Sequence, residues 1–133
     1  MTTTTAAKQS SYVPGVCNIN HAEIARRRRI GYIGLAVMAV LFALLTAFHL
    51  KGAIRIVLFF PAFIAASGFL QARYKFCSGY GSSGRQNAQE GSTTATAVTD
   101  DAAIQKDKNR AVMINMQAAV IALIASAVAL LLS

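Results

Sequence analysis

Apolar residues gather into three long blocks along this chain. They cover residues 30–50, 53–72 and 111–132, and the segments between them are polar or basic. At a rise of about 1.5 Å per residue, blocks of this length cross the roughly 30 Å of hydrocarbon in a bilayer. A helix in a soluble core alternates apolar with polar positions, whereas a helix in lipid does not have to. The pattern predicts an all-α bundle of three transmembrane helices, with the first two spans forming a helical hairpin.

The second block is the least regular of the three. Arg55 interrupts its beginning and Gln71 its end, so we expect Arg55 to extend outward to the lipid headgroups. Pro61 removes a backbone donor and predicts a kink. Gly52, just before Arg55, predicts a tight turn between the first two spans.

Small residues in each block predict faces where another helix can approach closely. The three sets are Ala39, Ala43 and Ala47 in the first block, Ala62, Ala65, Ala66, Ser67 and Gly68 in the second, and Ala118, Ala122 and Ser126 in the third. Asn115 and Gln117, just inside the third block, are each expected to form one hydrogen bond to a neighbouring helix.

The polar segments divide the chain into a flexible tail, residues 1–19, and a three-span membrane domain, residues 20–133. Asn20 followed by Glu23 is typical of a helix start in which the two side chains cap each other's backbone donors, so we expect a short helix before the first span. Residues 77–99 are rich in Gly, Ser and Thr and predict a flexible connector. Thr99 or Asp100 is expected to begin the last helix.

Composition and charge support a membrane location and add an orientation. Of the 133 residues, 55% are hydrophobic and 14% are charged, against about 25% charged in a typical soluble domain. Eleven of the thirteen basic residues precede the first span or lie between the second and third, and the other two are Lys51 and Arg55. Basic loops stay on the cytoplasmic side. The N-terminus and the connector of residues 73–110 are therefore predicted to be cytoplasmic, and the first hairpin tip and the C-terminus outside, in a bacterial inner membrane.

The net charge of +8 is interpreted as contact with membrane lipids that have anionic headgroups. Nucleic acid is not an expected partner, because the sequence has no zinc-finger spacing and no basic stripe interleaved with aromatic residues. The residues predicted to contact headgroups are Arg26, Arg27, Arg28, Arg29, Arg73 and Lys75.

The two cysteines, Cys17 and Cys77, are predicted to lie on the same side of the membrane. Three interpretations are open: two unrelated reduced thiols, as is usual in the cytosol; a disulfide or redox pair, which requires close α-carbons; or a metal site formed with His21. The spacing of Cys17 and His21 matches no strong zinc signature.

No motif in the sequence identifies a reaction, so an enzyme is not favoured and no cofactor is predicted. The Gly-rich run of residues 77–84 lacks the Lys-Ser/Thr ending of a phosphate-binding loop. No Ser-His-Asp set or pair of carboxylates is present. The three blocks contain no Asp, Glu or Lys at depth, which argues against a proton-coupled transporter.

Two stretches resemble a group of small bacterial membrane proteins of unassigned function. The stretches are VCNINHAEIARRRRIGYIGL and FFPAFIAASGFLQARYKFCSGYG. The resemblance covers about a third of the chain. It implies that Cys17 and Cys77 belong to one structural unit, and it implies no activity.

The leading functional hypothesis is a non-catalytic interaction, scaffold or accessory-subunit role. Three helices leave much small-residue surface exposed, which favours a homo-oligomer or a larger membrane complex. One alternative is a thiol-redox or metal-binding protein that acts through Cys17 and Cys77. A further alternative is an oligomeric channel or small-solute carrier.

Overall fold

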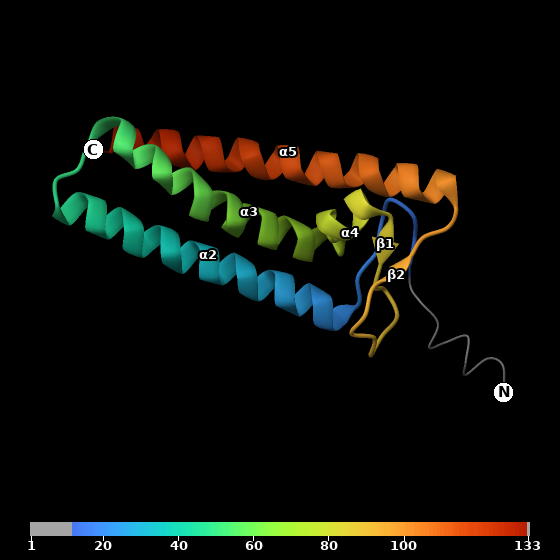
Figure 1. Ribbon diagram of the computed structural model, residues 1–133. Coiled ribbons are helices and arrows are strands. Elements are labelled where there is room, and N and C mark those ends of the chain that lie inside the picture. The colour runs from blue at the N-terminus through green and yellow to red at the C-terminus, as the bar shows by residue number, and fades with distance from the viewer. Residues whose placement is uncertain (1–11, 133) are drawn as a thin grey trace.

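The computed structural model of the chain describes residues 12–132 (Figure 1). Three long helices run side by side: α2 (His21–Ala47), α3 (Phe59–Tyr74) and α5 (Asp101–Leu131). A 3-10 helix, η1 (Gly52–Leu58), leads into α3. The segments α2, η1 with α3, and α5 are each long and apolar enough to cross a membrane. The structure therefore confirms the predicted all-α, three-helix fold and fits a multi-pass membrane protein.

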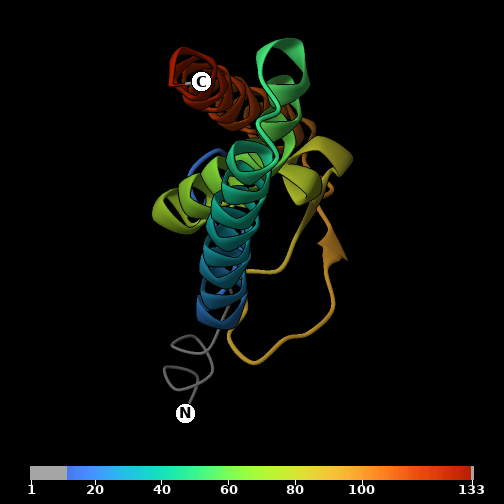
Figure 2. The ribbon, with the colours of Figure 1, turned by 90° about the vertical axis from the view of Figure 1, so that its left-hand side faces the viewer.

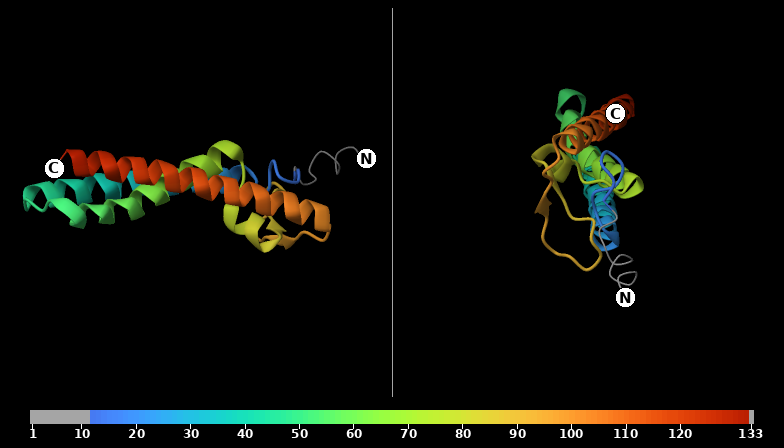
Figure 3. Two further views of the ribbon diagram at one scale, coloured as in Figure 1. Left: turned by 90° about the horizontal axis from the view of Figure 1, so that it is seen from above. Right: turned by 90° about the vertical axis from the view of Figure 1, so that its right-hand side faces the viewer.

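The molecule is elongated, with different structures at its two ends. The turn between α2 and η1 lies at the same end as the C-terminal end of α5 (Figure 3, left). The opposite end carries the short helix α4 (Ser78–Ser83) and the antiparallel strands β1 (Arg85–Gln86) and β2 (Thr96–Ala97). The connector predicted to be flexible thus contains secondary structure, and its loop stands out to one side of the helices (Figure 2).

Glycines bring α2 and α3 into backbone contact. A Cβ atom added to Gly34 would lie 2.6 Å from the amide nitrogen of Ala65, and one added to Gly68 would lie 2.6 Å from that of Gly31. The predicted face on α3 is confirmed, because Ala62, Ala65, Ala66 and Gly68 are buried.

The ridge predicted on the first span does not form this contact. Ala39, Ala43 and Ala47 are all exposed in the described structure. Glycine permits a closer backbone approach than alanine because it has no Cβ, and α3 packs where Gly31 and Gly34 provide that approach. The alanine ridge is left without a partner from within the described chain.

The ridge predicted on the third span is confirmed. Ala118 and Ala122 are fully buried and Ser126 is 1% exposed. The Ser126 hydroxyl donates to the carbonyl of Ala122 at 2.9 Å, so its polar atom is satisfied within α5. Gln117 accepts a hydrogen bond from the Tyr74 hydroxyl of α3 at 3.0 Å, as expected for a polar side chain between membrane helices. Asn115 instead faces outward from α5 and is exposed.

The prediction that Arg55 extends outward is wrong. Only 2% of Arg55 is exposed. Its Nε donates to the carbonyl of Leu50 at 2.9 Å, and its guanidinium lies 5.3 Å from the centre of the Phe42 ring. The Leu50 carbonyl and the face of the Phe42 ring both attract the guanidinium, so the Arg55 side chain is directed into the protein. The second span changes from 3-10 to α helix between Leu58 and Phe59, and Pro61 sits in the first turn of α3, where its missing N–H costs little. The kink at Pro61 stays a prediction.

Candidate functional site

A compact polar unit, which we call the head, occupies one end of the bundle. It comprises residues 12–20 and 75–98 together with the first turns of α2 and α5. Residues 12–19 fall within the predicted flexible tail, and residues 1–11 of that tail lie outside the described residues. The segment of residues 17–20 passes through the centre of the head and contacts the chain on both sides of α4.

Asn18 joins the N-terminal segment to the end of the second span. Its side-chain oxygen accepts from the amide of Cys77 at 2.6 Å, and its side-chain nitrogen donates to the carbonyl of Cys77 at 3.1 Å. Its backbone carbonyl accepts from the amide of Asn87 at 2.8 Å. Asn18 is fully buried. One side chain thus satisfies both backbone groups of a buried residue that lies 59 positions away.

Asn20 binds the connector and also caps the N-terminal end of α2. The amide of Glu23 donates to its side-chain oxygen at 2.9 Å, which confirms the predicted N-cap. Its side-chain nitrogen donates to the carbonyls of Gln89 and Ser92 at 2.8 and 3.1 Å. The expected short helix is the first part of one continuous α2. Glu23 does not complete a capping box, because its carboxylate accepts from the hydroxyl of Tyr80 instead.

Asp107 anchors the N-terminal segment to α5. Its two carboxylate oxygens accept from the Tyr12 hydroxyl at 2.6 Å and from the Gly15 amide at 2.7 Å. Asp107 is fully buried. Burial, together with this hydrogen bond and the negative charge of Asp107, raises the pKa of Tyr12. Sequence reasoning missed this contact, because Asp107 stands among charged residues that are otherwise exposed or half-buried.

Cys77 lies in a cluster of charged and aromatic side chains. The Nη2 atom of Arg27 is 3.0 Å from the Cys77 sulfur, and Nη1 of Arg27 is 3.6 Å from the Glu23 carboxylate. The Tyr80 hydroxyl donates to Glu23 at 2.8 Å. Burial, the hydrogen bond to Glu23 and the charge of Glu23 raise the pKa of Tyr80. Cys77 itself is only 6% exposed, whereas reactive cysteines are partly open to solvent.

The two cysteines and His21 each contact different partners in the structure. Both thiols are free, and the Cys17 sulfur lies 3.5 Å from the carbonyl of Ile19. His21 is exposed and pairs with Glu90, with 2.6 Å between Nδ1 and the carboxylate. Among residues 12–132, no group of three or more His, Cys, Asp or Glu residues is arranged to hold a metal ion. Cys17, His21 and Cys77 therefore do not come together as a ligand set.

Five of the six residues predicted to contact lipid headgroups are exposed at this end. Arg27 differs, because its side chain is 11% exposed and is directed to Glu23 and Cys77. The exposed residues are Arg26, Arg28, Arg29, Arg73 and Lys75. Together they form a basic surface around the head.

The similarity of this chain to other proteins was tested in three ways. Comparisons with family models, with curated proteins and with solved structures found no match. The resemblance to small bacterial membrane proteins therefore stays a prediction. In the head, buried polar side chains bind backbone groups and hold the surrounding chain in one conformation.

Proposed function

We propose that this chain is a non-catalytic interaction protein of the bacterial inner membrane. Its three spans anchor the head at the cytoplasmic face, and the exposed side of α2 binds another membrane helix. The observation that carries this proposal is the exposed ridge of Ala39, Ala43 and Ala47, which no other part of the described chain covers.

A groove beside this ridge supports the proposal. It has a volume of about 320 Å³ and lies between α2 and α5, with Ala39 and Phe42 on one side and Ala125 and Ala129 on the other. Lipid is as apolar as leucine, so membrane helices associate by close packing of small residues and not by the hydrophobic effect. A ridge of alanines next to an apolar groove is a surface of this kind. A second copy of the chain is the simplest partner with a matching surface.

A pair of substitutions tests the interaction. Ala43→Ile adds bulk to the ridge, and Ala127→Ile makes the same change at an exposed position of α5 that does not line the groove. We expect the wild type and Ala127→Ile to keep a larger mass in mild detergent, and Ala43→Ile to lose it. A wild-type monomer under these conditions, or equal loss in both variants, would contradict the proposal.

A labelling experiment tests the orientation separately. In a chain with Cys17→Ser and Cys77→Ala, single cysteines are placed at the exposed positions Lys51 and Ser82. The basic surface of the head supports a cytoplasmic location. We therefore expect an impermeant thiol reagent to label position 51 in intact cells and position 82 only after permeabilisation. The reverse result would overturn the orientation.

The two alternatives receive less support from the geometry. A thiol-based role through Cys17 and Cys77 is disfavoured because Cys77 is buried, whereas reactive cysteines are partly open to solvent. An oligomeric channel or solute carrier stays a prediction that the mass measurement also addresses, since it too requires an assembly of several copies.

A further inference from the structure

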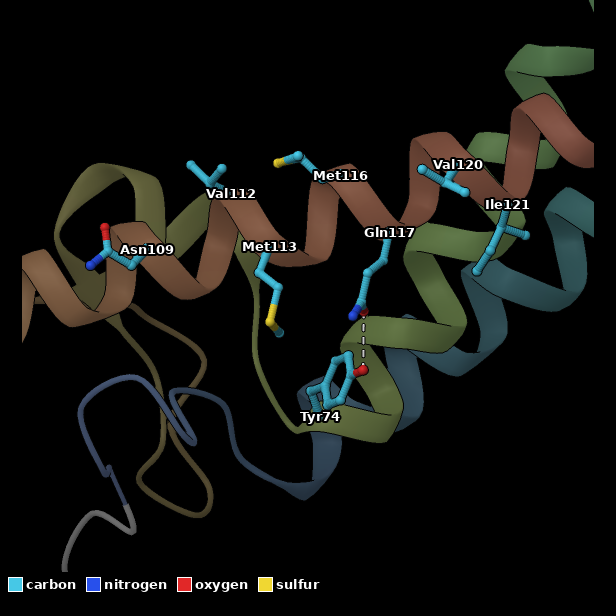
Figure 4. Close-up of a pocket in the computed structure, with 8 residues that line it drawn as sticks. All are labelled: Tyr74, Asn109, Val112, Met113, Met116, Gln117, Val120 and Ile121. Carbon is cyan, nitrogen blue, oxygen red and sulfur yellow. Dashed lines mark hydrogen bonds between the residues drawn. The ribbon is translucent and has the colours of Figure 1, made fainter.

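An open groove runs along the outer face of α5, away from the alanine ridge. Its volume is about 630 Å³, and its walls include the apolar residues Val112, Met116, Val120 and Ile121 (Figure 4). In Figure 4, the Gln117 side chain points from α5 toward Tyr74, to which it is hydrogen-bonded. The groove is therefore apolar along its length, with a polar contact where α5 meets the end of α3.

A second hollow continues this groove into the head. It has a volume of about 350 Å³ and shares the wall residues Asn109 and Met113 with the first. Its other walls include Gly15, Lys106 and Arg110. The wall residues on α5 recur at intervals of three or four, at positions 106, 109/110, 113, 116/117 and 120/121. The two hollows therefore occupy one face of α5. This face is basic at the head and apolar beyond it.

Arg110 lines the hollow at the head end of this face. Its guanidinium carbon lies 4.5 Å from the centre of the Tyr74 ring, and its Nη1 is 3.8 Å from the sulfur of Met113. Its Nε atom is buried and has no hydrogen-bond partner in the described structure. The nearest acid in sequence, Asp107, is fully buried and accepts from Tyr12 and Gly15, and within residues 12–132 it forms no ion pair with Lys106 or Arg110.

We propose that this face of α5, which we call the α5 face, binds one phospholipid with an anionic headgroup. The phosphate lies against Lys106 and Arg110, and one acyl chain follows α5 past Met116 to Ile121. From Arg110 to Ile121 the helix rises about 16 Å at about 1.5 Å per residue, close to the roughly 15 Å depth of one leaflet of hydrocarbon. Basic pockets beside membrane helices on the cytoplasmic side bind anionic headgroups for the same electrostatic reason.

This site differs from the general headgroup contacts at Arg26–Arg29, Arg73 and Lys75, because it combines a fixed cationic end with a groove for the acyl chain. It rests on the membrane insertion proposed above but not on the oligomer. The experiment that tests it therefore has to separate failure of insertion from failure of the site.

The sequence allows a clean fluorescence test, because it contains no tryptophan. Val120→Trp places a reporter in the groove, and Leu123→Trp places one outside it at nearly the same depth. The two positions are matched in exposure, at 54% and 55%. Each variant is reconstituted into vesicles of equal parts phosphatidylglycerol and phosphatidylcholine, with bromine quenchers on the acyl chains of one lipid or the other.

We expect brominated phosphatidylglycerol to occupy the groove in preference to phosphatidylcholine by at least about fivefold at Val120→Trp, the scale of one basic residue near a membrane surface. No preference is expected at Leu123→Trp. Lys106→Gln or Arg110→Gln should reduce the preference severalfold. Lys108→Gln removes the same charge from an exposed position outside both hollows and should leave it unchanged. Circular dichroism checks that each variant is folded, and Lys106→Gln, at an exposed residue, supplies the test if Arg110→Gln unfolds.

Three results would overturn the site. Equal quenching by both lipids at Val120→Trp would show an ordinary lipid boundary, and an equal effect of Lys108→Gln would show only diffuse surface charge. Quenching at Leu123→Trp but not at Val120→Trp would show that protein covers the groove. Quenching at neither position would overturn membrane insertion itself, and the site with it.

Discussion

The membrane helices and the head are held together by different kinds of interaction. Where α2 meets α3, the contact is steric: Gly31, Gly34 and Gly68 leave room for backbone atoms to touch. In the head, the contacts are hydrogen bonds from buried side chains to distant backbone groups, as at Asn18 and Asn20. The first region depends on the absence of atoms at a few positions, and the second depends on particular polar atoms.

This difference follows from the two environments. Helices in lipid gain little from burying apolar surface against each other, so close packing decides how they associate. At the polar end, a chain without a large apolar core has to satisfy its buried backbone groups one by one. We therefore expect added bulk to disrupt the packing of the helices and the loss of polar atoms to disrupt the head. Each kind of substitution should have little effect on the other region.

The largest loss in the free energy of unfolding is expected from Gly34→Ile. Its Cβ atom would fall 2.6 Å from the backbone nitrogen of Ala65, so α2 and α3 would have to separate. Overpacking of this kind costs about 3 kcal/mol. The free energy of unfolding in mixed detergent, followed by circular dichroism, measures the loss.

A glycine in the head provides the control. A Cβ added to Gly79 would meet only the Cys77 sulfur, at 3.8 Å. Gly79→Ala should change the free energy of unfolding by a few tenths of a kcal/mol at most, and alanine's higher helix propensity favours a small gain. If Gly34→Ile were as harmless as Gly79→Ala, the close contact between α2 and α3 would be contradicted.

The next largest effect is expected from Asn18→Ala, which acts on the head alone. It leaves the amide of the buried Cys77 without its partner, at a cost of about 2 kcal/mol, while the Cys77 carbonyl keeps its hydrogen bond from the Gly81 amide. Hydrogen exchange should rise in residues 75–90 while the amides of α2 and α3 within the apolar zone keep their protection.

Gln89→Ala provides the matched control for this change. The Gln89 side chain is exposed, and the carbonyl that Asn20 binds is retained. Exchange in residues 75–90 should stay at the wild-type level. Loss of protection throughout the helices of Asn18→Ala would contradict the separation of the two regions.

The sequence predicts the helical region well because its signals are local. Apolar runs mark the three spans, and Asn20 and Asp100 mark helix starts, with side-chain oxygens that accept from Glu23 and Ala103 respectively. Burial was harder to predict. Whether Arg55 turns inward depends on where the Leu50 carbonyl and the Phe42 ring lie after the turn has formed.

The head could not be predicted because its contacts join distant residues. The hydrogen bonds of Asn18, Asn20 and Asp107 span 59 to 95 positions, and no periodic pattern encodes such pairings. The one local signal was Asn20 followed by Glu23, which predicts the start of α2 but not the hydrogen bonds from Asn20 to Gln89 and Ser92. Residues 77–99 are rich in Gly, Ser and Thr, and this composition predicts flexibility. Their order comes from contacts with distant residues, which include the hydrogen bonds of Asn18 and Asn20 and the close approach of Gly81 to α5.

A smaller effect is expected from the contact of Tyr12 with Asp107. Because the pKa of folded Tyr12 is raised, its stabilising contribution is complete below its ordinary value of about 10 and is lost as the pH rises through the folded value. Tyr12→Phe should cost about 1 kcal/mol at neutral pH. Absorbance at 295 nm should show Tyr12 and Tyr80 ionising late, and Asp107→Asn should lower the midpoint of Tyr12 alone. An unchanged midpoint in Asp107→Asn would contradict the contact.

The smallest effect is expected from His21 and Glu90, which tie the connector loop to the start of α2 at an exposed position. Hydrogen bonds from the backbone and side chain of His21 lower the pKa of Glu90, so this contribution is present above the usual carboxyl range and is lost as the pH falls through the folded value. Their side chains are 86% and 52% exposed, so solvent screens the pair, and His21→Ala should cost only a few tenths of a kcal/mol. Asn20→Ala, one residue earlier, should cost more because it removes a helix cap and two buried hydrogen bonds. Hydrogen exchange of residues 89–92 compares the two variants directly, and equal loosening would mean that an exposed ion pair, and not the buried asparagine, holds the loop.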